Sequence, residues 1–308
     1  MPRKTGTGTS SPRLRRGDCT RFAPLRSVSA LKFTAAILSL VLALFAAAPQ
    51  RIVSLSPNVT ELLYGIGAFP QVVGVSDYCT YPPEVRKISS VGGWHDPSLE
   101  KLAALRPDLV VVDDAQAPFV QDSFRKLGLR LMVVPTHHVA DVYRAIDELG
   151  KATGHETQAA QLAAATRQGL ARVAQKTAAL HRNSVVLIVD RTPGTLRELI
   201  DATGGSFLAE LVDIAGGRMA LPPAKDGYAK LSKEDLLAAN PDVILDFVHG
   251  ADGRFAANPI EAWHEMPELK AVRAGRVYPV NEDYVPHASQ RMVQTAELFA
   301  RLIHPEAK

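Results

Sequence analysis

Short runs of apolar and β-branched residues alternate with helical stretches along most of the chain. Between residues 51 and 135 the runs RIVSLS, QVVGVS, LVVVDD and LRLMVVP are separated by segments with helical spacing. The alternation returns after residue 183 with SVVLIVD, a helix around 204–215, VILDFV and RVYPV. Strands that alternate with helices indicate parallel sheets covered by helices. The pattern therefore predicts an α/β protein with two similar lobes.

A long amphipathic segment separates the two alternating regions. Residues 155–181 contain no proline and a single glycine, and their apolar positions recur at helical spacing. About 27 residues at about 1.5 Å each form a rod of roughly 40 Å, which is long for a helix inside one lobe. We therefore expect a single long bridging helix at 155–182, between an N-terminal lobe at 50–154 and a C-terminal lobe at 183–308.

An internal repeat supports this duplication. A helix that ends in Pro-Asp and leads into a buried strand occurs twice, with identical spacing and a separation of 134 residues. The matching positions are Glu100, Leu102, Ala104, Pro107 and Asp108 in the first copy, and Glu234, Leu236, Ala238, Pro241 and Asp242 in the second.

The first 48 residues are typical of a secretory signal peptide. A basic stretch precedes the apolar run FTAAILSLVLALFAAA, which is shorter than the roughly 20 residues needed to span a bilayer. Pro49 follows the most natural cleavage site, so a membrane-anchored form is the alternative to a free periplasmic protein. Cys19 precedes the apolar run and is not placed to carry a lipid. Its removal leaves Cys79 as the only thiol, which excludes an intramolecular disulfide.

Charge argues against a nucleic-acid partner. Residues 1–48 hold eight of the 35 Lys and Arg but one of the 32 Asp and Glu, so the remaining chain carries 27 basic and 31 acidic side chains. A protein that neutralises phosphates needs a basic face. With 46% hydrophobic and 22% charged residues, the body is expected to be soluble and globular.

The loops at the carboxyl ends of the predicted strands are where a ligand is expected. Parallel sheets bind ligands at that edge, and two facing lobes place two sets of loops across one cleft. The loops contain Ser56, Pro57, Asn58, Ser76, Asp77, Tyr78, Tyr81, Trp94, His95, Asp113, Asp114, Thr136, His137 and His138 in the first lobe, and Asp190, Arg191, Tyr228, His249, Asn281, Glu282, Asp283, Tyr284 and His287 in the second.

Aromatic side chains gather in these loops although they make up only 6% of the chain. Tyr78, Tyr81, Trp94, Tyr228 and Tyr284 all occupy such positions, and aromatic walls with polar tips suit a large flat ligand. The alternative is that these rings simply cover the ends of the sheets. Trp94, in the glycine-rich turn GGWHDP, is the strongest single candidate.

The chain lacks the usual catalytic motifs. We find no nucleophile elbow, phosphate-binding loop, zinc-protease motif or dinucleotide-binding motif. His287 is the best candidate for contacting a metal, because the adjacent His137 and His138 point different ways in an extended chain. An exported enzyme with Asp113, Asp114 and His137 in its cleft is the alternative of another class.

The segments RIVSLSPNVTELLYGIG, VVGVSDYCTYPPEV, VGGWHDPSLEKLAALRPDLVVV and LSKEDLLAANPDVIL together resemble the periplasmic substrate-binding proteins of the cobalamin and iron–siderophore uptake class. The resemblance extends over nearly all of residues 50–300. It implies two α/β lobes bridged by one rigid helix, a monomer, and the membrane permease of an ABC importer as partner.

The resemblance also implies roles for individual residues. Glu100 and Glu234 occupy the positions of the acids that dock onto the membrane subunits in cobalamin-binding members. The matching ligand positions are Tyr78, Trp94, Tyr228 and Asp283.

Two departures make the expected site more polar than a cobalamin pocket. Asp113 and Asp114 replace a tryptophan, and Asp190 and Arg191 replace an aromatic-bearing loop. Arg191 could pair with a carboxylate or catecholate, and His287 with Tyr284 could ligate haem iron or a bare metal.

We therefore expect a periplasmic binding protein, not an enzyme, that captures cobalamin or a related metal chelate and has no resident cofactor. A receptor of the same class for haem, a ferric siderophore, a bare metal or an oxyanion is the alternative. The proposed ligand-binding set is Tyr78, Trp94, Asp190, Arg191, Tyr228, Asp283, Tyr284 and His287.

Overall fold

The computed structural model describes residues 48–247 and 259–307. The predicted signal peptide at 1–48, with Cys19, lies outside the described residues except for Ala48, and so does the candidate loop residue His249. Within the described ranges, no helix is both long enough and apolar enough to cross a bilayer.

The first lobe is built on a wholly parallel sheet with the strand order β3-β2-β1-β4-β5. Its strands are β1 (Ile52–Ser54), β2 (Val72–Val75), β3 (Ser89–Ser90), β4 (Leu109–Asp113) and β5 (Leu131–Val134). Its helices are α2 (Pro57–Gly65), α3 (Leu99–Leu105), α4 (Ala117–Lys126) and α5 (Val139–Thr153), with short 3₁₀ turns at Phe69–Gln71 and Pro83–Lys87.

The second lobe contains a six-stranded sheet with the order β11-β10-β6-β7-β9, in which β8 also pairs with β6. Its strands are β6 (Ser184–Asp190), β7 (Leu199–Ala202), β8 (Arg218–Met219), β9 (Tyr228–Leu231), β10 (Val243–Phe247) and β11 (Val277–Val280). Its helices are α7 (Phe207–Ile214), α8 (Lys233–Ala239), α9 (Lys270–Arg273) and α10 (Met292–Ile303), with a 3₁₀ turn at Glu261–Glu265.

The second sheet differs from the expected all-parallel arrangement. Strand β7 runs antiparallel to β6, and β9 runs antiparallel to β7. Parallel pairing in this sheet is confined to β6, β8, β10 and β11. The predicted α/β fold with two lobes is confirmed, with a mixed sheet in the second.

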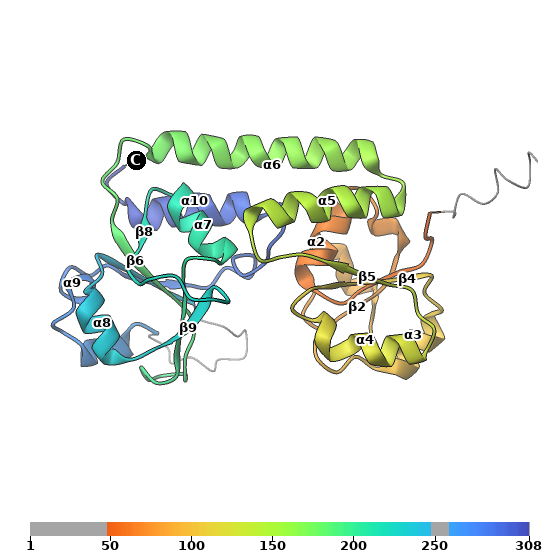
Figure 1. Ribbon diagram of the computed structural model, residues 1–308, viewed down its shortest axis with the longest axis horizontal. Helices are drawn as coiled ribbons and strands as arrows, with labels where there is room; N and C mark the ends of the chain where they lie inside the picture. Colours follow the sequence, from red (N-terminus) through yellow and green to blue (C-terminus); the bar gives the residue numbers. More distant parts are fainter. Residues whose placement is uncertain (1–47, 248–258, 308) are drawn as a thin grey trace, which may run out of the picture. The chain divides into compact units, whose positions relative to one another are not determined.

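Helix α6 (Glu156–Thr177) links the two lobes and packs against α5 of the first and α10 of the second (Figure 1). Its buried positions recur at helical spacing, as expected for a helix with one apolar face. Gly169 allows a close approach, because a Cβ there would lie 2.7 Å from a Val293 methyl on α10.

Each sheet has apolar residues on both faces. One core cluster joins the α2, α5, α6, α7 and α10 side of both lobes, whereas separate clusters fill the other face of each sheet. The other face of the first sheet contains Val53, Val110 and Phe124, and that of the second contains Ile244 and Trp263. Helices therefore cover both faces, and the carboxyl ends of the strands remain available for a site.

The internal repeat has the same geometry in both lobes. The side chains of Ser98 and Ser232 cap α3 and α8 by accepting a hydrogen bond from a backbone N–H. The backbone N–H of Asp108 donates to the carbonyl of Arg51, and that of Asp242 donates to the carbonyl of Ser184.

The side chains of the same two aspartates accept hydrogen bonds from the start of the central strand. Asp108 accepts from the backbone N–H groups of Gln50 and Arg51, and Asp242 accepts from that of Ser184 at 2.8 Å. Each Asp therefore ties the end of its helix to the beginning of the central strand, which explains why the repeated unit ends in Pro-Asp.

Candidate functional site

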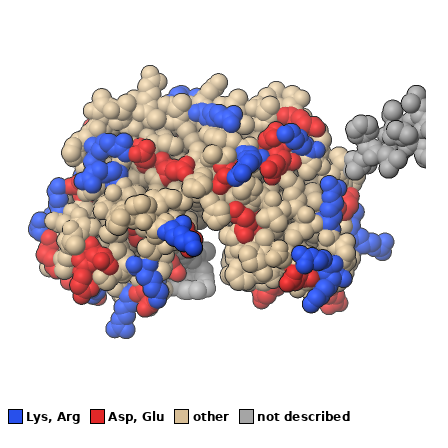
Figure 2. All heavy atoms as spheres, in the orientation of Figure 1, with Lys and Arg blue, Asp and Glu red and all other residues tan. Residues whose placement is uncertain are grey.

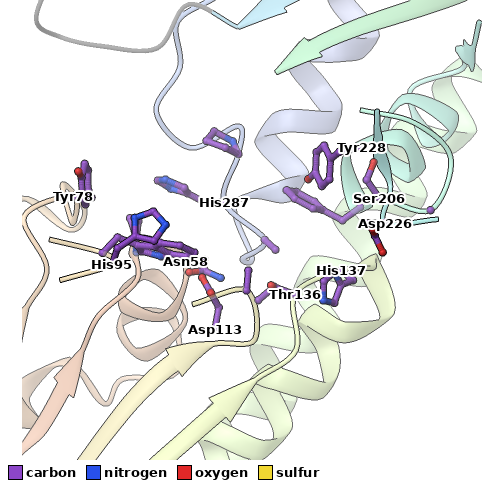
Figure 3. Close-up of a pocket in the computed structure, with 17 residues that line it drawn as sticks. Asn58, Tyr78, His95, Asp113, Thr136, His137, Ser206, Asp226, Tyr228 and His287 are labelled. Carbon is purple, nitrogen blue, oxygen red and sulfur yellow. The ribbon is translucent and has the colours of Figure 1, made fainter. Parts of the chain in front are cut away.

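A cavity of about 600 Å³ lies at the carboxyl ends of the strands and is lined by residues of both lobes (Figure 3). This volume is within the range typical of small-molecule sites. The lining residues are Pro57, Asn58, Tyr78, Trp94, His95, Asp113, Ala115, Thr136 and His137 from the first lobe, and Gly205, Ser206, Phe207, Asp226, Tyr228, Pro286, His287 and Ala288 from the second. Of the predicted ligand-binding residues, Tyr78, Trp94, Tyr228 and His287 are brought together here.

Two connected loops present the aromatic side chains of the first lobe. The backbone N–H of Asp77, next to Tyr78, donates to the carbonyl of Gly92 at 2.9 Å, and the Ser90 hydroxyl donates to the Asp77 carboxylate. Tyr78 is 61% exposed, so a large part of its ring is available to a ligand.

Gln116, which is fully buried, holds the Trp94 loop from below. Its Nε2 donates to the carbonyl oxygens of Trp94 at 2.6 Å and of Leu55 at 3.2 Å. The Ser56 hydroxyl donates to its Oε1 at 2.9 Å. The backbone under the indole is therefore fixed by a buried amide whose side-chain atoms all have partners.

An aromatic group extends from the cavity to the surface. The Trp94 and His95 rings are 4.5 Å apart and edge-on, and His95 makes the same contact with Phe119. Phe119 is 57% exposed. Edge-to-face packing is a favourable arrangement for such rings, so these three residues form a wall beside the cavity mouth.

Asp113 is the buried acid of the cavity. It ends β4, is 7% exposed, and accepts a hydrogen bond from the backbone N–H of Gln116 at 2.8 Å. Burial raises the pKa of its carboxyl group, and the neighbouring charge of Asp114 acts in the same direction. Among the described residues, no Lys or Arg forms an ion pair with it.

His137 and Asp114 lie beside this acid. The Nε2 atom of His137 is 3.0 Å from a carboxylate oxygen of Asp114, and the Thr136 hydroxyl donates to the other oxygen at 2.8 Å. This pair and Asp113 are the residues of the enzymatic alternative. These residues lie in one region, on the first-lobe side of the cavity.

The second lobe contributes a wall that the sequence analysis largely missed. Ser206 begins α7 as its N-cap, Phe207 follows it, and Asp226 precedes Tyr228 at the start of β9. Only Tyr228 was expected here, because it is the aromatic residue of this group that falls in a recognisable loop. The glycines beside these residues, Gly204 and Gly205 before Ser206 and Gly227 after Asp226, were the available signal.

Glu61 connects the lobes directly beneath the cavity. This carboxylate on α2 is 1% exposed and accepts hydrogen bonds from His287 Nδ1 and Arg291 Nη1, each at 2.9 Å, and from the Ser289 hydroxyl. Arg291 also lies over the Tyr81 and Tyr284 rings, at 4.4 and 4.7 Å from the centroids. No local pattern in the sequence links Glu61 to these partners, which are more than 220 residues away.

Four predicted ligand-binding residues do not line the cavity. The Arg191 guanidinium is fully buried and forms a bidentate ion pair with Asp246, to which Trp263 also donates at 2.8 Å. Asp190 is exposed nearby. Asp283 accepts a hydrogen bond from Thr80 at 2.8 Å, and Tyr284 packs under Arg291. Asp283 therefore contributes to the contact between the lobes, whereas Tyr284 packs against a residue of its own lobe.

The predicted docking acids are both accessible. Glu100 and Glu234 lie in the first turns of α3 and α8 and are exposed. Both helices lie on the side of the lobes opposite α6 (Figure 1). Basic and acidic side chains are interspersed over the face drawn in Figure 2, without a continuous basic track for a phosphate backbone.

The described side chains do not form a site for a bare metal ion. Within residues 48–247 and 259–307, no three His, Cys, Asp or Glu side chains are grouped so that they could hold a metal ion. Cys79 is buried and contacts the hydroxyls of Thr60 and Ser76. Burial raises the pKa of its thiol, which disfavours the thiolate needed for metal binding.

Comparison with known proteins agrees with this architecture. Residues 52–284 match the family described as "Periplasmic binding protein". An uncharacterized ABC transporter substrate-binding lipoprotein, YvrC, of Bacillus subtilis (strain 168) is 30% identical over 266 residues, covering 84% of this chain and 81% of that protein. A vitamin B12-binding protein of Photorhabdus laumondii is 28% identical over 262 residues, covering 84% and 89%.

A solved structure shows the same fold. The crystal structure of a periplasmic heme binding protein from Pseudomonas aeruginosa superposes with a TM-score of 0.72 at 23% identity, covering 84% of this chain and 94% of that one. With a family match over three quarters of its length and two lobes around a shared cavity, this chain belongs to the periplasmic binding protein family.

Proposed function

We propose that this protein is an exported receptor that captures cobalamin or a related metal chelate between its lobes and delivers it to an ABC importer. The ligand would lie between the lobes at 50–154 and 183–308, which the helix at 155–182 joins. The protein would act by binding alone and without a resident cofactor. The family and the substrate-binding lipoprotein among its relatives support this role.

The acidic lining of the cavity is the observation that favours cobalamin over anionic chelates. Its described lining contains Asp113 and Asp226, the His137–Asp114 pair at its edge, and no Lys or Arg. Haem carries two propionates and a ferric catecholate carries net negative charge, so both would meet repulsion in a site of low dielectric constant. Cobalamin presents neutral amides that donate hydrogen bonds to carboxylates, while its flat ring suits Tyr78, Trp94 and Tyr228.

Haem is the second candidate, favoured by one observation. Three histidines, His95, His137 and His287, line the same cavity, and imidazole is a common axial ligand of haem iron. A bare metal is disfavoured because the described residues contain no group of three suitable ligands. An oxyanion is disfavoured by the acidic lining.

Docking is proposed to use the two repeated acids. Glu100 and Glu234 are exposed at equivalent positions of the two lobes, so each lobe would present one negative charge to the basic residues of a membrane subunit. The export signal proposed at 1–48 would place the protein in the periplasm, free or anchored by an uncleaved leader.

The direct test is calorimetric titration of the purified protein with cyanocobalamin, haemin and a ferric tricatecholate. We expect one equivalent of cyanocobalamin to bind with a Kd of micromolar or below, and the two anionic chelates to bind at least roughly tenfold more weakly. Asp113→Asn should reduce the preference for cyanocobalamin over the two anionic chelates. Asp190 is an exposed acid outside the cavity, so Asp190→Asn should leave that preference unchanged. Tighter binding of haemin by the native protein would select the second candidate.

A further inference from the structure

We propose that His287 provides, through its Nε2 atom, an axial ligand to the metal of the bound chelate, and that Glu61 is the residue that positions it. This inference rests on the proposed function, because it requires a metal chelate in the cavity. It adds a coordination bond to recognition by stacking and charge.

The hydrogen bond at the other ring nitrogen determines which atom is available. Nδ1 of His287 lies 2.9 Å from Oε1 of Glu61. A carboxylate can only accept, so Nδ1 carries the proton of this bond. In the neutral imidazole the lone pair then lies on Nε2, which has no hydrogen-bond partner among the described residues.

Glu61 is held firmly enough to orient the ring. It is 1% exposed, and Arg291 and Ser289 donate to the same carboxylate. The Gln290 amide also donates to its backbone carbonyl at 2.7 Å. A carboxylate behind an imidazole is the usual second partner of a metal-binding histidine, since it fixes the tautomer and raises the basicity of the other nitrogen.

The ring has access to the cavity. The His287 side chain is 15% exposed and forms part of the lining between Pro286 and Ala288. In Figure 3 it lies between Tyr78 and His95 of the first lobe and Tyr228 of the second. A flat chelate held by these aromatic rings would therefore have an imidazole nitrogen beside it.

The other two histidines of the cavity lack this arrangement. His137 has its Nε2 committed to Asp114 at 3.0 Å. His95 packs edge-on against Trp94 and Phe119 and has no carboxylate partner among the described residues. His287 is therefore the histidine whose surroundings match a preorganised ligand.

The proposed step is a ligand exchange without redox chemistry. The Nε2 lone pair forms a bond to the metal, and the bond between the metal and a coordinated water breaks. The water leaves intact, and no electron or proton is transferred. Aquocobalamin carries such an exchangeable water, whereas cyanide blocks that position in cyanocobalamin.

The experiment compares these two corrinoids by calorimetry and visible spectroscopy. We expect the native protein to bind aquocobalamin at least roughly tenfold more tightly than cyanocobalamin, with a shift of the visible bands of the bound aquocobalamin toward those of its imidazole complex. His287→Gln keeps a donor to Glu61 but removes the ligand nitrogen. It should lose the shift and roughly tenfold of the preference for aquocobalamin.

Two further variants separate coordination from a structural role. His95→Ala should retain the spectral shift. Glu61→Gln should keep the shift but lose roughly tenfold of the preference for aquocobalamin. Binding of both corrinoids without a shift in the native protein, or an undiminished shift in His287→Gln, would overturn the inference and leave the proposed function standing. Failure of both corrinoids to bind would overturn the proposed function and the inference with it.

Discussion

Strands β4 and β10 are equivalent in the internal repeat, yet each places a buried aspartate in a different setting. Asp113 ends β4, lines the cavity, and lacks a basic partner among the described residues. Asp246, one position earlier in the repeat, is fully buried and paired with Arg191 and Trp263. The aligned position of Asp113 is Phe247, which is 2% exposed.

The difference shows how two equivalent strands of an internal repeat come to serve different purposes, one in the binding cavity and one in the core. A buried carboxylate needs compensation, since isolated burial of charge is costly. Asp246 receives that compensation from within the protein, so its charge is matched without a ligand. Asp113 receives only hydrogen bonds and faces the cavity, where a ligand that donates hydrogen bonds would complete its surroundings.

The largest expected effect comes from breaking the compensated pair. Arg191→Met removes the cation from Asp246, so a buried charge is left with Trp263 as its main remaining donor. Loss of one partner of a buried pair typically costs about 3–5 kcal/mol. Urea unfolding of Arg191→Met should show this loss, while the refolded protein keeps its ligand affinity. A loss below about 1 kcal/mol would mean that the pair is not the structural element described.

A third buried aspartate provides the next test. Asp201 on β7 accepts a hydrogen bond from Leu187 through one oxygen, and its other oxygen has no partner among the described residues. Burial raises the pKa of Asp201 to about 7. The folded state therefore keeps a proton that the unfolded chain loses above about pH 4.

The free energy of unfolding should accordingly fall by on the order of 1 kcal/mol per pH unit between about pH 4 and 7, as far as Asp201 contributes, and level off above pH 7. Urea denaturation across this range measures the slope. Asp201→Asn should flatten it and raise stability near neutral pH, whereas an unchanged slope in this variant would assign the pH dependence to other groups.

Asp113→Asn should have a smaller effect of the same sign. Burial raises the pKa of Asp113. Ionisation of this carboxyl group therefore lowers the free energy of unfolding once the pH exceeds the pKa of a free carboxyl group. The amide should stabilise the ligand-free protein by about 1 kcal/mol at pH 8 and have no stabilising effect at pH 4. Thermal unfolding at the two pH values checks this, and destabilisation at pH 8 would contradict the uncompensated state of Asp113.

The smallest effect on stability is expected at the two equivalent surface acids. Glu100→Lys and Glu234→Lys each change an exposed residue, so their unfolding free energies should lie within about 0.5 kcal/mol of the native value, with ligand affinity unchanged. Uptake by cells that carry the cognate importer should fall for both. Normal uptake by either variant would remove that acid from the docking surface.

The repeat, the long helix and the aromatic loops could be predicted because their signals are local. Pro-Asp ends two helices at equal spacing, α6 lacks proline, Tyr78 follows a short apolar strand, and Trp94 lies in a glycine-rich turn. Strands β7 and β9 were missed, since LIDA and YAKL are short and adjoin a glycine-rich loop.

The contacts that decide whether a charged residue meets a ligand or another part of the protein could not be predicted from the sequence. Arg191 was expected to meet a ligand, but the structure pairs it with Asp246, 55 residues away. Glu61 reads as an ordinary acid near the start of a helix, and only the fold brings His287 and Arg291 to it. Whether a buried charge is compensated depends on such distant contacts, which no local pattern encodes.

The most direct test of the binding site is anomalous diffraction at the cobalt edge from crystals of the protein with aquocobalamin. We expect a single anomalous peak inside the cavity bounded by Trp94, Tyr228 and His287. Bound cobalamin whose cobalt peak lies elsewhere on the protein would contradict the assignment of the cavity as the binding site.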